Sequence, residues 1–403
     1  MKKRVMKTSV LALGNLKAKP VRSACLGVVA AILAFTLCGG SILALNLRQG
    51  LATMTRRFGA DLMVVPEGAA EKAQAALLFG ETGFFYFDGA ITDTIAGTEG
   101  VVCATPQFFL SSLSTECCDA AVQLIAYDPE TDFVVQPWIA EKYSGSVEDG
   151  QLVVGSRIWL RPNGTIKLFD HEYPVAAQLS KSASGLDTSI FMTMNTMRLL
   201  IDRAHAEKYN FLADSYGEGA ISAVLVKADQ PENTTRLAFT IRRENEGVDV
   251  LVSQSIFSGI AATLAGLTDY IYLLSAGLWL LAVIVLAAVF SLSLHERKKE
   301  FAVLRILGAT RRKLVGIVLG ESAIAGIAGG TAGIVLASTV IFPFSTLISE
   351  RLELPYLDAP LAHIALLVVG SLVLSSMVGP LASLCAALRI SRAETYFTMR
   401  EGE

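Results

Sequence analysis

Four long apolar runs without a charged residue constrain the fold of this chain more than any other feature. They cover residues 23–47, 270–294, 322–349 and 364–388. A helix needs only ~20 apolar residues to cross the hydrocarbon core of a bilayer, so each run predicts one transmembrane helix. The first run is longer than the apolar region of a cleaved signal peptide, which has ~7 to 15 residues. We therefore expect it to remain as an anchor.

The distribution of charge predicts the orientation of these helices. Seven Lys and Arg and no acid precede Leu26, and the segment 295–313 is also basic, whereas the segment 345–361 has one Arg against three acids. By the positive-inside rule, both termini and the segment 295–313 are cytoplasmic. The region between the first two helices then lies outside. Residues 48–269 hold 28 acidic and 16 basic residues, a net charge of −12, which suits a solvated domain and excludes an obvious nucleic-acid surface.

The predicted fold class is an α-helical membrane protein with four transmembrane helices and an α+β extracytoplasmic domain inserted between helices 1 and 2. The helices are expected at 23–47, 269–294, 314–341 and 361–388. The outer parts are the domain 48–268 and the loop 342–360, and the cytoplasmic parts are 1–22, 295–313 and 389–403.

The outer domain is expected to mix strands and helices. Runs rich in β-branched residues and bounded by Gly, Pro, Asn or Asp predict strands at 60–66, 120–128, 151–160, 164–179, 220–229 and 248–256. Two helices are predicted, one at 195–209 with Asn195 as its cap and one at 233–245.

Catalytic motifs are absent from the sequence. There is no G-x-x-x-x-G-K-[ST] phosphate-binding loop, so the chain is not its own ATPase of that kind. The four His are scattered, and neither H-E-x-x-H nor G-x-S-x-G occurs. We expect a membrane subunit that is not an enzyme and that binds no cofactor of its own.

The segment between the second and third apolar runs carries the most specific pattern. It reads HERKKEFAVLRILGATRRKL from His295 to Leu314 and leads into a Gly-rich helix. The pattern resembles the signature E-R-x-x-E-x-x-x-L-R-x-L-G-A-x-R of FtsX/MacB-type permeases, and the chain layout is similar over its whole length. The matching positions are Glu296, Arg297, Glu300, Leu304, Arg305, Leu307, Gly308, Ala309 and Arg311, followed by Glu321.

This resemblance implies a type VII ABC transporter permease of the bacterial cytoplasmic (inner) membrane. Such a permease works as a homodimer with a separate cytoplasmic P-loop ATPase that binds ATP and Mg²⁺, and it transmits motion to its outer domain. The residues themselves favour a short helix with an apolar patch that Gly308 ends in left-handed geometry. Such a helix could dock on the ATPase. The alternative is an anchor to lipid headgroups, which explains the charge alone.

The third apolar run has small residues at helical spacing and one acid. Glu321 lies one to two turns inside the membrane, where an acid is usually paired or functional, so pairing with a base and a role in gating both stay open. Small residues four apart allow close helix packing, within one subunit or between two. The residues concerned are Gly316, Gly320, Gly326, Gly329, Gly330 and Gly333.

Sulfur-containing residues of the outer domain suggest three alternatives. Cys103 could form a disulfide with Cys117 or Cys118, or the thiols could be unpaired and inert. The third alternative is a soft-ligand site for haem or a metal, in which Met192 and Met194 would share one strand face. Some FtsX-like permeases near haem-exporter and iron loci are similar, which raises this hypothesis.

The function expected from these features is ATP-driven export or handover of haem, a metal species or an amphipathic molecule, with a substrate-binding or envelope protein as a further outer partner. A rival hypothesis is a non-transporting regulator of a cell-envelope enzyme or of lipoprotein release. A second rival is a membrane-anchored receptor without an ATPase. An exporter should have a ligand-sized apolar cleft in its outer domain, and a regulator should have a flat surface for a partner.

Overall fold

The chain divides into two compact units in a computed structural model that describes residues 20–112, 118–207, 209, 219–296, 300, 303, 305, 306, 308–351 and 355–392. The helical unit comprises residues 1–46, 264–347 and 359–403. The sheet unit comprises residues 47–263 and 348–358.

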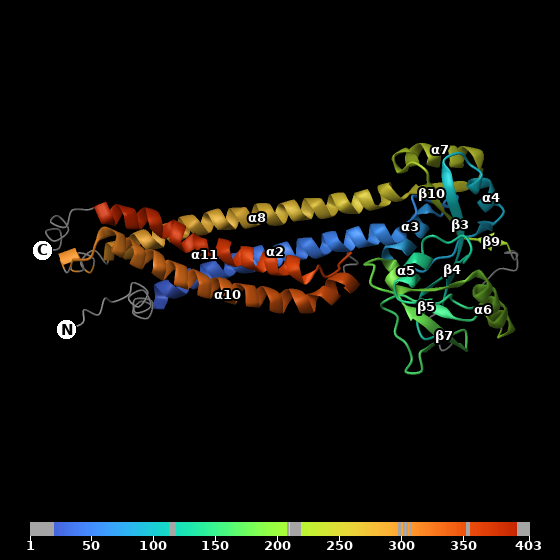
Figure 1. Cartoon of the computed structure of the whole chain (residues 1–403), viewed down its shortest axis with the longest axis horizontal. Coiled ribbons are helices and arrows are strands. Elements are labelled where there is room, and N and C mark those ends of the chain that lie inside the picture. Colours follow the sequence, from blue (N-terminus) through green and yellow to red (C-terminus); the bar gives the residue numbers. More distant parts are fainter. Residues whose placement is uncertain are drawn as a thin grey trace. The chain divides into compact units, whose positions relative to one another are not determined.

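Four helices in the described residues are long and apolar enough to cross a membrane. They are α2 (Pro20–Phe58), α8 (Ser253–Glu296), α10 (Arg311–Arg351) and α11 (Leu361–Arg392), and within the helical unit they run alongside one another (Figure 1). Large apolar side chains such as Leu273 and Leu366 are about 70% exposed on them. Such exposure is typical of helices surrounded by lipid. Residues of both α2 and α8 belong to both units.

A nine-stranded mixed sheet forms the centre of the sheet unit. Its strand order is β11-β1-β10-β3-β4-β8-β5-β7-β6, and the pairs β4/β8 and β5/β7 are parallel while the other pairs are antiparallel. The short strands β2 (Phe87–Asp88) and β9 (Ala220–Ile221) pair separately. The strands of the large sheet are β1 (Leu62–Pro66), β3 (Val101–Ser111), β4 (Gln123–Tyr127), β5 (Leu152–Val154), β6 (Thr165–Leu168), β7 (His171–Gln178), β8 (Ser189–Thr193), β10 (Ala223–Ala228) and β11 (Val248–Val252).

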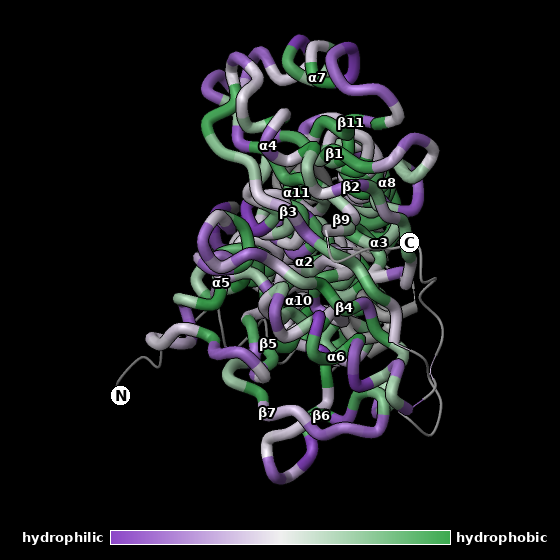
Figure 2. Tube along the Cα trace, turned by 90° about the vertical axis from the view of Figure 1, so that its right-hand side faces the viewer, coloured by the Kyte–Doolittle hydropathy of each residue, from purple (hydrophilic) through white to green (hydrophobic). Residues whose placement is uncertain are grey.

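Helices cover both faces of this sheet because alternate strand residues point to opposite sides. One face carries α4 (Ile91–Ala96) and α7 (Thr234–Glu244) over β1 and β10, and α6 (Met194–Ala206) over β4 and β8. The other face carries α3 (Ala70–Phe79), α5 (Gln136–Ala140), the 3₁₀ helix η1 (Gly185–Thr188) and the terminal turns of α2 and α8. Hydrophilic and hydrophobic residues alternate along α7, as expected for a helix with one buried face (Figure 2).

The β6–β7 hairpin turns through Phe169 and Asp170, which have φ angles of 49° and 65°. Positive φ at both central residues is the geometry of a type I′ turn, whose twist matches that of paired strands. Phe is unusual in this conformation. Its ring is fully buried and lies 6.0 Å from that of Tyr209, so tertiary packing holds the turn.

Several expected elements need correction. The single strand expected at 164–179 is wrong, because the chain reverses at Phe169 and Asp170 to form two strands. The strand expected at 151–160 ends at Val154, because the amide of Gln178 donates to carbonyl oxygens of the next residues, including that of Ile158 at 2.9 Å. Asn195 is not the cap of α6, since the Thr193 side chain accepts the hydrogen bond from the Thr196 N–H.

Candidate functional site

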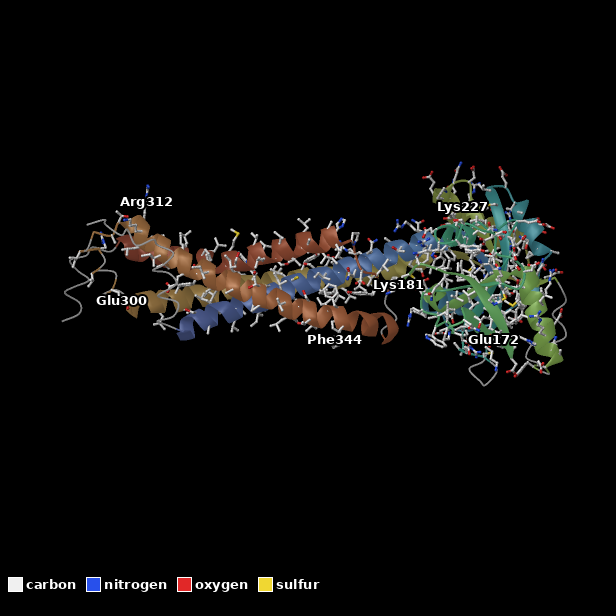
Figure 3. The ribbon with its side chains drawn as sticks, turned by 60° about the horizontal axis from the view of Figure 1, so that its bottom comes forward. Glu172, Lys181, Lys227, Glu300, Arg312 and Phe344 are labelled. Atoms are coloured by element: carbon white, nitrogen blue, oxygen red, sulfur yellow. The ribbon has the colours of Figure 1, made fainter. Side chains whose placement is uncertain are left out.

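The basic segment that resembles the permease signature lies at one end of the helical unit. Glu300 and Arg312 lie at that end, and Phe344 lies toward the other (Figure 3). Gly308 has a φ of 90°, which confirms the expected left-handed geometry, and its N–H donates to the Arg305 carbonyl at 3.0 Å. Ile306 is 64% exposed. An exposed apolar residue next to Arg305 suits a surface that meets another molecule.

Parts of this segment lie outside the described residues, so their expected roles stay predictions. They are Arg297, Leu304 and Leu307, and also the side chains of Glu296 and Arg311.

Helix α10 packs against α2 through Gly329 and Gly333. A Cβ on Gly329 would clash with the carbonyl oxygen of Gly27, and one on Gly333 would clash with that of Ala31. Both α2 positions are also small and four residues apart. The two helices therefore approach at backbone distance, as the small-residue spacing predicts.

A second side of α10 packs against α11. A Cβ on Gly326 would lie 3.0 Å from the Ser376 carbonyl oxygen, and one on Gly330 would lie 2.8 Å from the Ser375 hydroxyl. The Ser322 hydroxyl lies 3.3 Å from that of Ser383. These four glycines therefore pack helices within one subunit, which resolves the alternative left open by the sequence.

Two other intramembrane residues differ in their surroundings. Gly316 has no described neighbour within 4 Å of its Cβ position in the same chain, so its expected role in close packing stays a prediction. Glu321 is buried, with 3% of its surface exposed, and directly precedes Ser322 in the contact with α11. Gly320 lies on the same helix.

The expected sulfur site is only partly assembled. Cys118 and Met192 pack into the same core beneath α6, and the Cys118 Sγ accepts a hydrogen bond from the Phe169 N–H at 3.3 Å. Met194 begins α6 and does not share a strand face with Met192, because the chain leaves the sheet after Thr193. Cys103 and Cys118 are free thiols, so the disulfide between these two is excluded. Cys117 lies outside the described residues.

No group of three His, Cys, Asp or Glu that could hold a metal occurs within the described ranges. Cys118 and Met192 instead belong to an apolar core, where methionine serves as filler. The described residues thus provide a packed cluster rather than an open ligand set.

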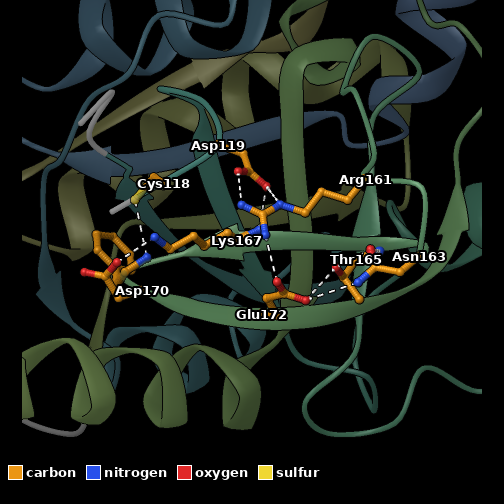
Figure 4. A network of polar contacts seen from close by, with 9 residues as sticks. Cys118, Asp119, Arg161, Asn163, Thr165, Lys167, Asp170 and Glu172 are labelled. Carbon is orange, nitrogen blue, oxygen red and sulfur yellow. Dashed lines mark hydrogen bonds and ion pairs between the residues drawn. The ribbon is translucent and has the colours of Figure 1, made fainter. Parts of the chain in front are cut away.

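A polar network that the sequence did not predict lies next to Cys118 (Figure 4). Asp119 forms two hydrogen bonds with the guanidinium of Arg161, at 2.9 and 2.8 Å, and also accepts the Lys167 N–H at 2.8 Å. Arg161 reaches Glu172 at 2.7 Å. These bonds join Asp119 to a hairpin segment that begins 42 residues later in the sequence, so no local pattern could have revealed them.

Ion pairing in this network shifts the pKa values of two carboxylates. The hydrogen bond from Arg161 holds the pKa of Asp119 below its ordinary value, and the Lys167 ammonium, 2.7 Å from Asp170, lowers the pKa of that carboxyl. The network holds Asp119, and the chain next to it, against the β6–β7 hairpin.

A comparison with known families finds a match to part of the helical unit. Residues 272–395 match the family model described as FtsX-like permease C-terminal. These residues are an FtsX-like permease domain. The permease signature at 296–311, the helices α10 and α11, and the part of α8 from residue 272 onward lie within the match.

The chain is also similar to an uncharacterized ABC transporter permease, MJ1507, of Methanocaldococcus jannaschii. The two are 22% identical over 178 residues, which are 44% of this chain and 43% of the relative. The match thus spans less than half the length of that relative.

Two solved domains resemble part of the chain in structure. The periplasmic region of MacB from Actinobacillus actinomycetemcomitans is 10% identical, with a TM-score of 0.32, and the match covers 51% of this chain and 95% of that one. The extracellular domain of the transporter YknZ from Gram-positive bacteria is 13% identical, with a TM-score of 0.27, over 48% and 98% of the two chains. Scores this low carry no argument about function.

Proposed function

We propose that this chain is the permease subunit of an ABC transporter that transmits ATP-driven motion from a separate cytoplasmic ATPase to its extracytoplasmic unit. A homodimer would bind two copies of the ATPase through the segment 295–313. Support comes from the family match at 272–395 and from the similarity to an ABC transporter permease.

The observation that carries the proposal is the continuity of α2 and α8. Each contributes residues to both units as one unbroken helix, and neither contains a proline after its first residue. The last four residues of α10 also belong to the sheet unit, but α10 contains Pro343 and α11 contains Pro380, which remove a backbone hydrogen bond and favour kinks. The two proline-free helices are suited to carry displacement along the chain, and the other two complete the packing.

An amphipathic molecule is the substrate class that we favour. The soft-metal and haem alternatives relied on Cys117, Cys118, Met192 and Met194, of which Cys118 and Met192 lie in a closed apolar core. Export of a molecule with a large apolar part needs no metal ligands.

Charge reversal in the coupling segment tests the proposal. The triple variant Arg297→Glu, Arg305→Glu and Arg311→Glu should lower co-purification of the cytoplasmic ATPase and its stimulated ATP hydrolysis about tenfold or more, because charged docking contacts are lost. The matched control reverses Arg236, Arg242 and Arg243, which lie on α7 in the sheet unit. Unchanged ATPase association in the first variant would contradict the proposal.

A second function is favoured by one observation. One cavity among the described residues of the sheet unit has a volume of about 30 Å³, which is too small in this state to hold an amphipathic substrate. A non-transporting regulator of a cell-envelope enzyme or of lipoprotein release would need the same coupling but no ligand site. Binding of an apolar probe to the sheet unit separates the two functions.

A further inference from the structure

A small cavity lies beneath the sheet, on the face covered by α3 and α5. Its volume is about 30 Å³, which is room for about two water molecules. The sheet supplies Phe109 and Phe191 to its wall, and the covering elements supply Phe58, Leu77 and Trp138. The cavity is almost entirely apolar, so any occupant would bind mainly through apolar contact.

One polar group in this wall has an unmet hydrogen bond. Trp138 is 2% exposed, and its Nε1–H finds no acceptor among the described residues. A buried donor without a partner is unfavourable and calls for an explanation such as a ligand or water. Gln123, also in the wall, is different: it accepts from the Gly83 N–H at 2.9 Å and donates to the Leu110 carbonyl at 3.0 Å. Trp138 thus lines an apolar cavity and carries a buried donor that no described residue satisfies.

The last two residues of α2 hold the wall that contains Trp138. The Arg57 guanidinium donates to both oxygens of Glu141, at 2.7 and 2.5 Å, and its central carbon lies 5.3 Å from the centre of the Trp138 ring. The pKa of Glu141 is lowered by this hydrogen bond from Arg57. Phe58 lines the cavity and meets the ring of Phe257 edge-on at 5.8 Å.

Helix α5, which carries Trp138, depends on these contacts for its position. It has five residues, and a helix this short is not stable in isolation. Residues 20–46 of α2 belong to the helical unit, whereas Arg57 and Phe58 belong to the sheet unit. A rotation of α2 about its axis, or a translation along it, would therefore displace Arg57 and with it the contacts to Glu141 and Trp138.

We infer that the cavity beneath the sheet is a binding site for a small apolar group bearing a hydrogen-bond acceptor, and that Arg57 and Phe58 form a latch that keeps it closed. Release of the latch lets α5 move away from the sheet, enlarges the cavity and exposes the Trp138 N–H to the acceptor. This inference rests on the proposed function, because it names the contact through which motion of α2 would reach the outer unit and the class of molecule that would respond.

Trp138 itself provides the reporter. The chain has three tryptophans, and in a Trp159→Phe/Trp279→Phe background Trp138 is the one that remains. The full-length protein in nanodiscs is compared with an Arg57→Gln variant. The matched control is Arg56→Gln, because Arg56 donates hydrogen bonds to Ala52 and Thr53 of its own helix and acts on Glu141 through its charge alone. Measurements are acrylamide quenching of Trp138 and energy transfer from Trp138 to the naphthyl ketone prodan, whose carbonyl is an acceptor.

Arg57→Gln should raise the quenching constant about twofold or more through local opening, and prodan should show saturable energy transfer in this variant beyond that of Arg56→Gln. Glu141→Gln should reproduce both effects, with unchanged circular dichroism. Quenching equal to the parent in both variants would overturn the latch. Increased quenching without saturable prodan binding would overturn the ligand site. ATPase association is measured separately, so failure here leaves the test of the proposed function intact.

Discussion

The Asp119–Arg161 pair is the single interaction on which the edge of the sheet depends most. Two parallel hydrogen bonds from one guanidinium give both strength and direction, and a lysine could not reproduce them. The same carboxylate also takes the Lys167 N–H, so one side chain replaces a missing strand neighbour for β6.

Because of this pair, the stability of the folded protein depends on pH in the acid range. The folded-state pKa of Asp119 is lowered, chiefly by the hydrogen bond from Arg161, so its contribution is complete above the ordinary carboxyl pKa and is lost as the pH falls through the lower folded value. We predict that Asp119→Asn lowers the unfolding temperature at pH 7 and loses less stability than the parent on acidification below pH 4. Thermal unfolding in detergent over this pH range measures both effects, with Glu232→Gln, an exposed carboxylate on η2 (Pro231–Asn233), as the control. Parallel pH profiles of the parent and Asp119→Asn would contradict the prediction.

Helix α10 shows how one element can serve two neighbours. Gly329 and Gly333 meet α2, whereas Gly326 and Gly330 meet α11, so two sets of glycines lie on two sides of one helix. The sequence spacing predicts close packing but cannot assign a neighbour to each side. The spacing also implicated Gly316, which has space around it, because a small residue permits close approach without requiring it.

We predict that Gly329→Ala destabilises the helical unit by about 1–3 kcal/mol, because its new methyl group would overlap the Gly27 carbonyl oxygen and force α2 and α10 apart. Gly316→Ala on the same helix is the control, since its Cβ position has no neighbour within 4 Å. Unfolding in detergent, followed by circular dichroism, compares the two. Equal stability of both variants would show that the close approach of the two helices is absent.

Local sequence patterns predicted the strands of the sheet unit better than its turns. The strand expected at 60–66 is β1, and that at 120–128 contains β4, because runs of β-branched and aromatic residues encode them. The β6–β7 turn was missed because Phe169 carries no turn signal and has its positive φ angle where its ring is buried, so that Asp170 alone was too weak a signal. Strand β8 was not recognised because its five residues are all buried and lack alternation.

For the whole molecule, charge and apolar length carry information that contacts do not. The permease signature and the four apolar runs could be recognised in the sequence, and the signature and the last three runs overlap the family match at 272–395. The latch at Arg57 could not be recognised in the sequence, because its partner Glu141 lies 84 residues away. Both are residue types that are common on protein surfaces. Functional contacts of this kind depend on the topology of the sheet and not on a motif.

Orientation in the membrane is testable by labelling. We predict that Lys142→Cys reacts with a membrane-impermeant maleimide in intact cells and that Arg312→Cys reacts only after permeabilisation, because basic loops remain cytoplasmic. Both side chains are exposed. The six native cysteines are replaced by alanine in both variants. Labelling of Arg312→Cys in intact cells would reverse the predicted topology.

The first and last strands of the sheet unit pair with each other, Leu62 opposite Val252 and Pro66 opposite Val248. The two ends of this domain therefore leave it side by side, as in domains that tolerate insertion into another chain. A module built this way can be exchanged between permeases as a single cassette without altering the helices that flank it. Outer modules of this kind can therefore diversify while the helices that follow them keep a recognisable family signature.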